Sequence, residues 1–220
     1  VITSGYRVEM SCSDGCSFEI IFDDLKEIAS VKANSTISVE YTSTLLAGAT
    51  IGNQGNLNKA KLEFSNNPNQ EQGGTPETGE TSWDNVIVFT YQVVVNKYKN
   101  SVGAGNELTG AEFTLEKVLK DGSKKIIDVV KSNEGKTFTF KGLDDGDYIL
   151  TETTTPSGYN TIDPITFTVT ASHAIEWTTQ ERTGILTDLT TGNTATGNIT
   201  FTASEDKGTL TTNVVNKQGS

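Results

Sequence analysis

The sequence predicts an all-β protein that consists of β-sandwich domains in tandem. Short runs of alternating apolar and polar residues recur along the chain, and Gly, Asn and Asp residues separate them. Only DDLKEIASVKA (23–33) has a helical pattern, with Asp23 or Asp24 as its N-cap. Strands of this length and spacing are typical of two-sheet sandwiches. We place a domain boundary near residue 91.

The composition excludes several classes of function. The 220 residues contain 17 Lys and Arg against 28 Asp and Glu, a net charge of −11, which disfavours nucleic-acid and anionic-membrane binding. No apolar run approaches the roughly 18 residues of a membrane span, so no membrane insertion is expected in this segment. One histidine, His173, is expected at the surface. Without nucleotide-binding, hydrolase or metal-binding motifs, we expect no cofactor, no metal and no turnover enzyme.

The first part of the chain predicts four or five strands. Residues 1–22 contain two strands, and two more follow at 36–43 (TISVEYTS) and 59–66 (KAKLEFSN). Residues 67–84 are a polar loop with too few apolar residues to pack. So few strands cannot close a sandwich, and we expect a domain whose other half lies outside this sequence.

The two cysteines enclose a turn. Cys12 and Cys16 flank the turn dipeptide Asp14-Gly15. A disulfide would clip this hairpin and imply an oxidising compartment. Two free thiols remain the alternative, because so close a pair needs a bulge to reach disulfide geometry.

The second part of the chain predicts a complete sandwich. Its turns include DGS at 121–123 and an Asp-rich turn whose Asp144, Asp145 and Asp147 we interpret as solvated rather than as a calcium site. The strands are expected at 86–98, 111–119, 125–130, 136–141, 147–154, 164–171, 174–180, 183–189, 197–203 and 208–217.

Three polar residues share a strand face with apolar ones. Because strand side chains alternate, Lys97 follows the inward set of YQVVVNKY and Glu152 that of DYILTETT. In GTLTTNVVNKQ the inward set ends at Asn216, whereas Asn213 takes the other face. Strand ends that let these groups reach water, with an ordinary Lys97–Glu152 salt bridge, are one interpretation.

The other interpretation is a spontaneous Lys–Asn isopeptide bond. Burial lowers the pKa of a lysine and raises that of a carboxylic acid, so the amine becomes nucleophilic and the acid can polarise an amide. Folding holds the groups together, and the reaction occurs once without turnover.

These segments resemble a known family. YILTETTTPSGY (148–159) is similar to the E-box of Gram-positive backbone pilins, which sortases polymerise into pilus shafts. VVVNKY (93–98) with LTGAEFTLEK (108–117) resembles the opening of their Cna-B-type, immunoglobulin-like domain, and TNVVNKQGS (212–220) its last strand. The resemblance covers residues 91–217.

The resemblance implies a role for each polar residue. Lys97 would be the amine and Glu152 the catalytic acid, with Asn216 as the amide and Asn213 as its alternate. Residues 218–220 would precede a cell-wall sorting signal of the LPxTG type, which is absent here.

Residues 1–90 resemble the second half of a preceding pilin domain. KAKLEFSNNPN (59–69) is similar to its closing strand, so Asn66, or Asn67 as its alternate, would accept a second isopeptide bond. The donor lysine would lie outside this chain segment.

The expected function is therefore that of a pilus shaft subunit, secreted and displayed at the cell wall. Its partners would be other pilin subunits joined by sortase. The alternative is the stalk or binding module of a cell-wall-anchored adhesin that contacts a host surface or matrix, for which Trp83 is the residue to test.

Overall fold

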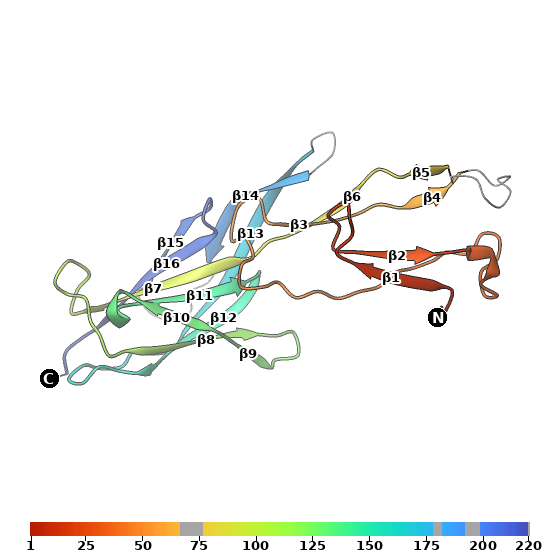
Figure 1. Ribbon diagram of the computed structural model, residues 1–220. Helices are drawn as coiled ribbons and strands as arrows, with labels where there is room; N and C mark the ends of the chain where they lie inside the picture. The colour runs from red at the N-terminus through yellow and green to blue at the C-terminus, as the bar shows by residue number, and fades with distance from the viewer. Residues whose placement is uncertain (67–76, 178–181, 192–198, 220) are drawn as a thin grey trace. The chain divides into compact units, whose positions relative to one another are not determined.

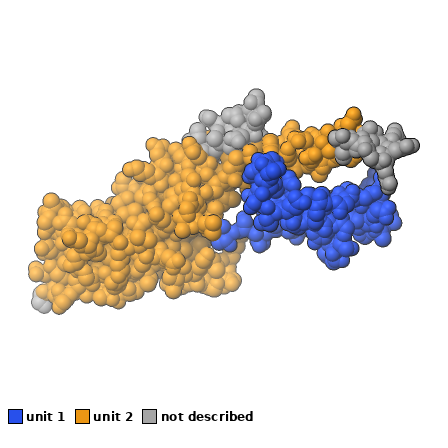
Figure 2. All heavy atoms as spheres, in the orientation of Figure 1, with its two compact units in different colours: residues 1–44 blue, residues 45–220 orange. Residues whose placement is uncertain are grey.

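The regular secondary structure of the computed structural model consists almost entirely of strands (Figure 1). It describes residues 1–66, 77–177, 182–191 and 199–219. The chain divides into two compact units, residues 1–44 and 45–220 (Figure 2). The predicted boundary near residue 91 falls inside the second unit, where a strand begins. The all-β prediction is confirmed, and neither short helix in the described ranges has the length or apolar character needed to span a membrane.

The first unit is built on one antiparallel hairpin. Strand β1 (Tyr6–Met10) pairs with β2 (Phe18–Phe22), and the Cys12–Cys16 turn joins them. The apolar side chains of β1 alternate as predicted but remain largely exposed, as Met10 at 70% illustrates. A two-stranded ribbon has no second layer to bury such a face.

Two predicted elements of this unit are wrong. The helix expected at 23–33 is only a single 3₁₀ turn, η1 (Leu25–Glu27), and Ile28 already has extended dihedrals. Asp24 does cap the turn, accepting a hydrogen bond from the Lys26 N–H at 2.8 Å. So short a helix is unstable without a surface to pack on. The strand expected at 36–43 is not part of any sheet in the described structure, although its residues alternate.

The second unit begins with two more ribbons. Strand β3 (Asn56–Ala60) pairs with β6 (Asp84–Val88), and β4 (Glu63–Ser65) pairs with β5 (Thr78–Glu80). The strand predicted at 59–66 is thus interrupted, because its two halves pair with different partners. Its apolar residues Leu62 and Phe64 are 59% and 45% exposed.

The remainder forms a two-sheet sandwich (Figure 1). One sheet has the order β10 (Val129–Ser132), β11 (Thr137–Leu143), β7 (Tyr91–Lys99), β16 (Thr209–Asn216) and β15 (Phe201–Ser204). The other has the order β14 (Arg182–Thr191), β13 (Ile165–Trp177), β12 (Gly146–Thr154), β8 (Glu112–Val118) and β9 (Lys124–Ile127). A second 3₁₀ turn, η2 (Asn133–Gly135), joins β10 to β11.

The apolar core lies between these sheets. Phe113 of β8 and Phe138 of β11 meet edge to face with ring centroids 4.9 Å apart. Both are essentially buried, as are alternate residues of β7, β12 and β16. The first and last strands, β7 and β16, run parallel as direct neighbours. The two ends of the sandwich's sequence therefore lie side by side in one sheet.

Four predicted strands of the sandwich have different limits. The segment 86–98 is divided after Val88, and Tyr91 begins β7. The segment 125–130 becomes two strands in different sheets, since β9 pairs with β8 and β10 with β11. Segment 164–171 and the described part of segment 174–180 belong to the single strand β13, whose pairing with β14 shifts register between Ser172 and His173. A bulge of this kind interrupts the regular pairing of a strand, and the sequence around it was therefore interpreted as a turn between two strands.

Candidate functional site

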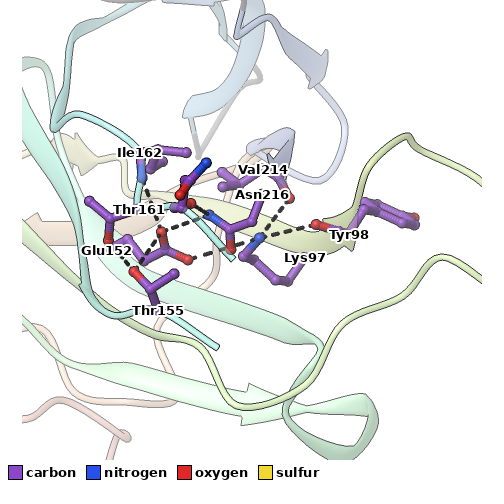
Figure 3. A network of polar contacts seen from close by, with 9 residues as sticks. Lys97, Tyr98, Glu152, Thr155, Thr161, Ile162, Val214 and Asn216 are labelled. Atoms are coloured by element: carbon purple, nitrogen blue, oxygen red, sulfur yellow. Dashed lines mark hydrogen bonds and ion pairs between the residues drawn. The ribbon is translucent and has the colours of Figure 1, made fainter. Parts of the chain in front are cut away.

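The three predicted polar residues meet inside the sandwich (Figure 3). Lys97 comes from β7, Asn216 from β16, and Glu152 from β12 in the facing sheet. Their exposed fractions are 1%, 0% and 6%, respectively. The interpretation in which strand ends let their charged groups reach water does not fit this burial.

The strand register decides which asparagine joins this cluster. In the parallel pair Lys97 lies opposite Val214, and Asn216 follows two residues later on the same inward face. Asn213 is exposed on the other face, where its Oδ1 accepts a hydrogen bond from Asn96 Nδ2 at 3.4 Å. The structure thus brings Asn216, and not Asn213, to Lys97 and Glu152.

The amine of Lys97 is held by main-chain carbonyls. Its Nζ donates to the Tyr98 carbonyl at 3.1 Å and to the Val214 carbonyl at 3.4 Å. Glu152 Oε1 lies 3.9 Å away, within ion-pair range. Burial lowers the pKa of Lys97 to about 8, and the negative charge of Glu152 opposes part of this shift. A neutral amine is therefore much more accessible here than at an exposed lysine.

The carboxamide of Asn216 is held through its nitrogen. Nδ2 donates to Glu152 Oε2 and to the Asn160 carbonyl, both at 2.9 Å. Both partners accept, which fixes the orientation of the amide because an oxygen in that place could not donate to a carbonyl. The same Glu152 oxygen accepts from the Ile162 N–H at 3.2 Å and from the Thr155 hydroxyl at 3.4 Å.

Two buried oxygens of the site are left unsatisfied. Glu152 Oε1 and Asn216 Oδ1 have no hydrogen-bond partner among the described residues. An orphaned buried acceptor costs about 1–3 kcal/mol, and a catalytic role is one reason for a folded protein to retain such a group. A proton on the carboxyl group of Glu152 would turn one of these acceptors into a donor.

Loop residues of the site were missed from the sequence. Thr155, Asn160 and Ile162 follow β12, and two of them act through main-chain atoms. The side-chain pattern carries no signal for such contacts. The proline and glycine of the TPSGY segment indicated only that a turn was present.

The predicted sites of the first 90 residues have a different setting. Asn66 is exposed, and its backbone N–H donates to the Glu77 carbonyl at 3.0 Å. Asn67 lies outside the described residues. Among the described residues of this region, no lysine–carboxylate pair is found at Asn66, so the second isopeptide bond stays a prediction.

The structure joins Cys12 and Cys16 in a disulfide, with Cα atoms 5.1 Å apart. The carboxylates of Asp14 and Glu19 approach the two sulfur atoms. Because both sulfurs are bonded to each other, they are not available as thiolate ligands to a metal.

The Asp-rich turn is organised by protein groups. Tyr148 donates its hydroxyl to the Asp144 carbonyl at 2.8 Å, and Lys117 forms an ion pair with the Asp144 carboxylate. Asp147 accepts from the Thr168 hydroxyl at 2.5 Å. Within the described ranges these aspartates do not gather as a metal-binding group.

His173, expected at the surface, is half-buried. Its ring stacks on Phe89 at 3.7 Å between centroids, and Nε2 lies 2.7 Å from the Tyr91 hydroxyl. Burial lowers the pKa of His173, so the neutral ring is favoured. The alternation of Val169 and Ala171 with His173 on β13 was a signal for this inward position.

Comparison with known proteins identifies the class of domain. Residues 93–183 match the family described as SpaA, a prealbumin-like fold domain. The matched segment begins in β7 and extends into β14, so it includes Lys97 and Glu152.

A relative similar in sequence is the trypsin-resistant surface T6 protein of Streptococcus pyogenes serotype M6. The identity is 29% over 170 residues, which cover 73% of this chain and 29% of that protein. The chain thus spans less than a third of this curated relative's length. This similarity agrees with the resemblance to Gram-positive backbone pilins that the sequence motifs carry.

Solved structures include two similar backbone pilins. The T6 backbone pilin of serotype M6 S. pyogenes, which has a modular three-domain structure, is 21% identical with a TM-score of 0.47, covering 79% of this chain and 45% of that one. The pilus 2b backbone protein of group B streptococcus is 19% identical with a TM-score of 0.35, covering 70% and 47%.

Proposed function

We propose that the chain is part of a pilus shaft subunit whose sandwich is locked by a self-formed Lys97–Asn216 isopeptide bond. The observation that carries this proposal is that an amine, a carboxyl and a carboxamide are buried together. The amine lies on the first strand, the carboxamide on the last strand and the carboxyl on the facing sheet. A buried ion pair is weak evidence for stability, since apolar residues serve equally well. Formation of a covalent bond would explain why these polar groups are buried despite the cost of removing them from water.

The reaction begins with the amine of Lys97. A neutral amine can donate its two hydrogens to the carbonyls of Tyr98 and Val214. Its lone pair is then left for the side on which Glu152 and Asn216 lie (Figure 3). The Nζ atom attacks Cγ of Asn216, and close contact makes this step effectively unimolecular.

Glu152 moves the protons. In its protonated form it donates to Asn216 Oδ1 and stabilises the negative charge that develops there, which gives both orphaned oxygens a partner. It then accepts a proton from Nζ and delivers one to Nδ2, which already forms a hydrogen bond with Oε2. The Nζ–Cγ bond forms, the Cγ–Nδ2 bond breaks and one ammonia leaves.

The position of the bond explains its value in a fibre. Force applied between the ends of the sandwich enters at β7 and leaves at β16. A bond from Lys97 to Asn216 carries that force directly, and the strands between them bear none of it. The subunit's partners would be other pilin subunits, and its place would be the surface of a Gram-positive cell, outside the membrane.

Pulling single molecules from both ends tests the mechanical role. We expect the sandwich to contribute no extension in the unmodified protein. Glu152→Ala should release the residues between Lys97 and Asn216, about 400 Å at about 3.4 Å per residue. Equal extension of both proteins would contradict the proposal.

Immunogold labelling of the cells that make the protein tests the place in the fibre. A shaft subunit predicts label along the length of surface fibres. Label confined to fibre tips would contradict a shaft role and favour the stalk of an adhesin.

A further inference from the structure

The loop after β12 and the residues after β16 are joined by main-chain hydrogen bonds beside the proposed bond. We call this arrangement the C-terminal clasp, consisting of Gly158–Asn160, Lys217–Gly219 and Asn100. The Asn160 N–H donates to the Lys217 carbonyl at 2.9 Å, and the Gly219 N–H donates to the Gly158 carbonyl at 3.1 Å. Between these two bonds, Tyr159 and Gln218 form an antiparallel β-bridge.

Asn100 secures the clasp from the end of β7. Its side-chain Oδ1 accepts from the Gln218 N–H at 3.3 Å, and its carbonyl accepts from Lys217 Nζ. Its own N–H donates to the Asn216 carbonyl at 2.8 Å. Asn100 has φ +59°, a conformation that asparagine tolerates better than most residues. Asn100 thus ties down the reacting asparagine itself and the two residues that follow it.

One residue of the clasp, Asn160, contacts a reacting atom directly. The peptide group preceding Asn160 contributes its N–H to Lys217, and the carbonyl of Asn160 accepts from Nδ2 of Asn216. Asn216 and Lys217 are adjacent, so Asn160 is held against the chain at the point where the amide must be placed. Two residues further on, the Ile162 N–H donates to Glu152 Oε2.

We propose that the C-terminal clasp is a positioning device for isopeptide formation. It holds the Asn160 carbonyl on the nitrogen that departs. When Glu152 protonates Nδ2 and the Cγ–Nδ2 bond breaks, positive charge develops on that nitrogen. A fixed carbonyl dipole stabilises this charge without reorganisation. The inference rests on the proposed function, because it concerns the rate of the same reaction.

Two pairs of variants separate positioning from folding. Asn160→Pro removes the N–H that donates to the Lys217 carbonyl. Asn160→Ala keeps both the N–H and the carbonyl of this residue. Asn100→Gly removes the Oδ1 acceptor while allowing the positive φ, and Asn100→Asp keeps an oxygen in its place. The full chain is made by pulse-labelled cell-free synthesis, and the loss of ammonia is followed over time by mass. The same variants in a Glu152→Gln background report the stability of the unreacted fold.

We expect Asn160→Pro and Asn100→Gly to react about 10- to 100-fold more slowly, which is the usual cost of a displaced reacting group. Asn160→Ala and Asn100→Asp should react at nearly the unmodified rate. In the Glu152→Gln background, Asn100→Gly and Asn100→Asp should melt at similar temperatures.

The outcomes distinguish this inference from the function on which it rests. If the unmodified chain never loses ammonia, the isopeptide proposal fails and the clasp has nothing to position. If the unmodified chain reacts and Asn100→Gly and Asn160→Pro react equally fast, the clasp proposal alone is overturned. A slow Asn100→Gly reaction that Asn100→Asp does not restore overturns it as well.

Discussion

The ribbons before residue 89 and the sandwich after it use the same alternating pattern with different results. Among the described residues, every buried apolar side chain lies between Tyr91 and Val214. The ribbons leave theirs exposed, as Val8 at 51% and Val86 at 59% show. Alternation therefore selects a face of a strand, but only a second sheet makes that face dry.

The two acceptor candidates illustrate the consequence for chemistry. Asn66 and Asn216 each continue an alternating apolar set at the end of a strand segment. Asn216 is fully buried against Glu152, whereas Asn66 is exposed. The low pKa of Lys97 also depends on burial, so the reactivity of this lysine requires the closed sandwich.

Of the changes considered, removing the crosslink should have the largest effect on the stability of the sandwich. We expect Glu152→Ala to lower the unfolding free energy of the sandwich by about 5 kcal/mol, by analogy with a disulfide that closes a loop of about 100 residues. Calorimetry should show a drop of roughly 15 °C in its melting temperature. An unchanged transition would mean that the sandwich is not crosslinked.

The pH dependence of bond formation sharpens the mechanism. The reaction needs one proton shared by Lys97 and Glu152, either on the amine before transfer or on the acid afterwards. That proton is lost as the pH rises through the lowered pKa of Lys97, about 8. The rate in newly made protein should therefore be level near pH 7 and fall about tenfold per unit well above 8. A rate that rises through pH 8 would show that Glu152 is not needed as an acid.

Reducing the disulfide should affect the first unit only. The Cys12–Cys16 bond closes a very short loop, for which the chain-entropy model gives about 2 kcal/mol. Hydrogen exchange in the β1–β2 hairpin should accelerate with a reductant, while the sandwich transition stays unchanged. A shift of the sandwich transition would contradict the independence of the two regions.

The smallest effects are expected at the alternate asparagines. Asn213→Ala removes only an exposed hydrogen bond, and its effect on stability should be within about 0.5 kcal/mol. Asn66→Ala should likewise leave the mass deficit of the chain unchanged, because no donor lysine is assigned to Asn66. Loss of the crosslink in Asn213→Ala would show that the register points to the wrong residue.

Strand periodicity was sufficient to predict the inward positions of the site. The phase of Lys97, Glu152 and Asn216 is a local property, and the buried positions of β7, β12 and β16 follow it. The contacts of the Asn160 carbonyl and the Ile162 N–H were not predictable, since main-chain groups are identical in every residue. They depend on how a loop crosses a distant strand.

The failed elements share a different cause. The 23–33 helix and the 36–43 strand had suitable local patterns, but the first is a single 3₁₀ turn and the second is not part of a sheet in the described structure. Local propensity is worth only tenths of a kcal/mol per residue and yields to missing tertiary contacts.

The central claim is a covalent bond between the first and last strands of the sandwich, and the intact mass of the folded, reduced protein tests it most directly. The account predicts a mass lower than the sequence mass by one ammonia, a Lys97–Asn216 linked peptide on digestion, and the full mass for Glu152→Ala. The full sequence mass in the folded, unmodified protein would contradict the account.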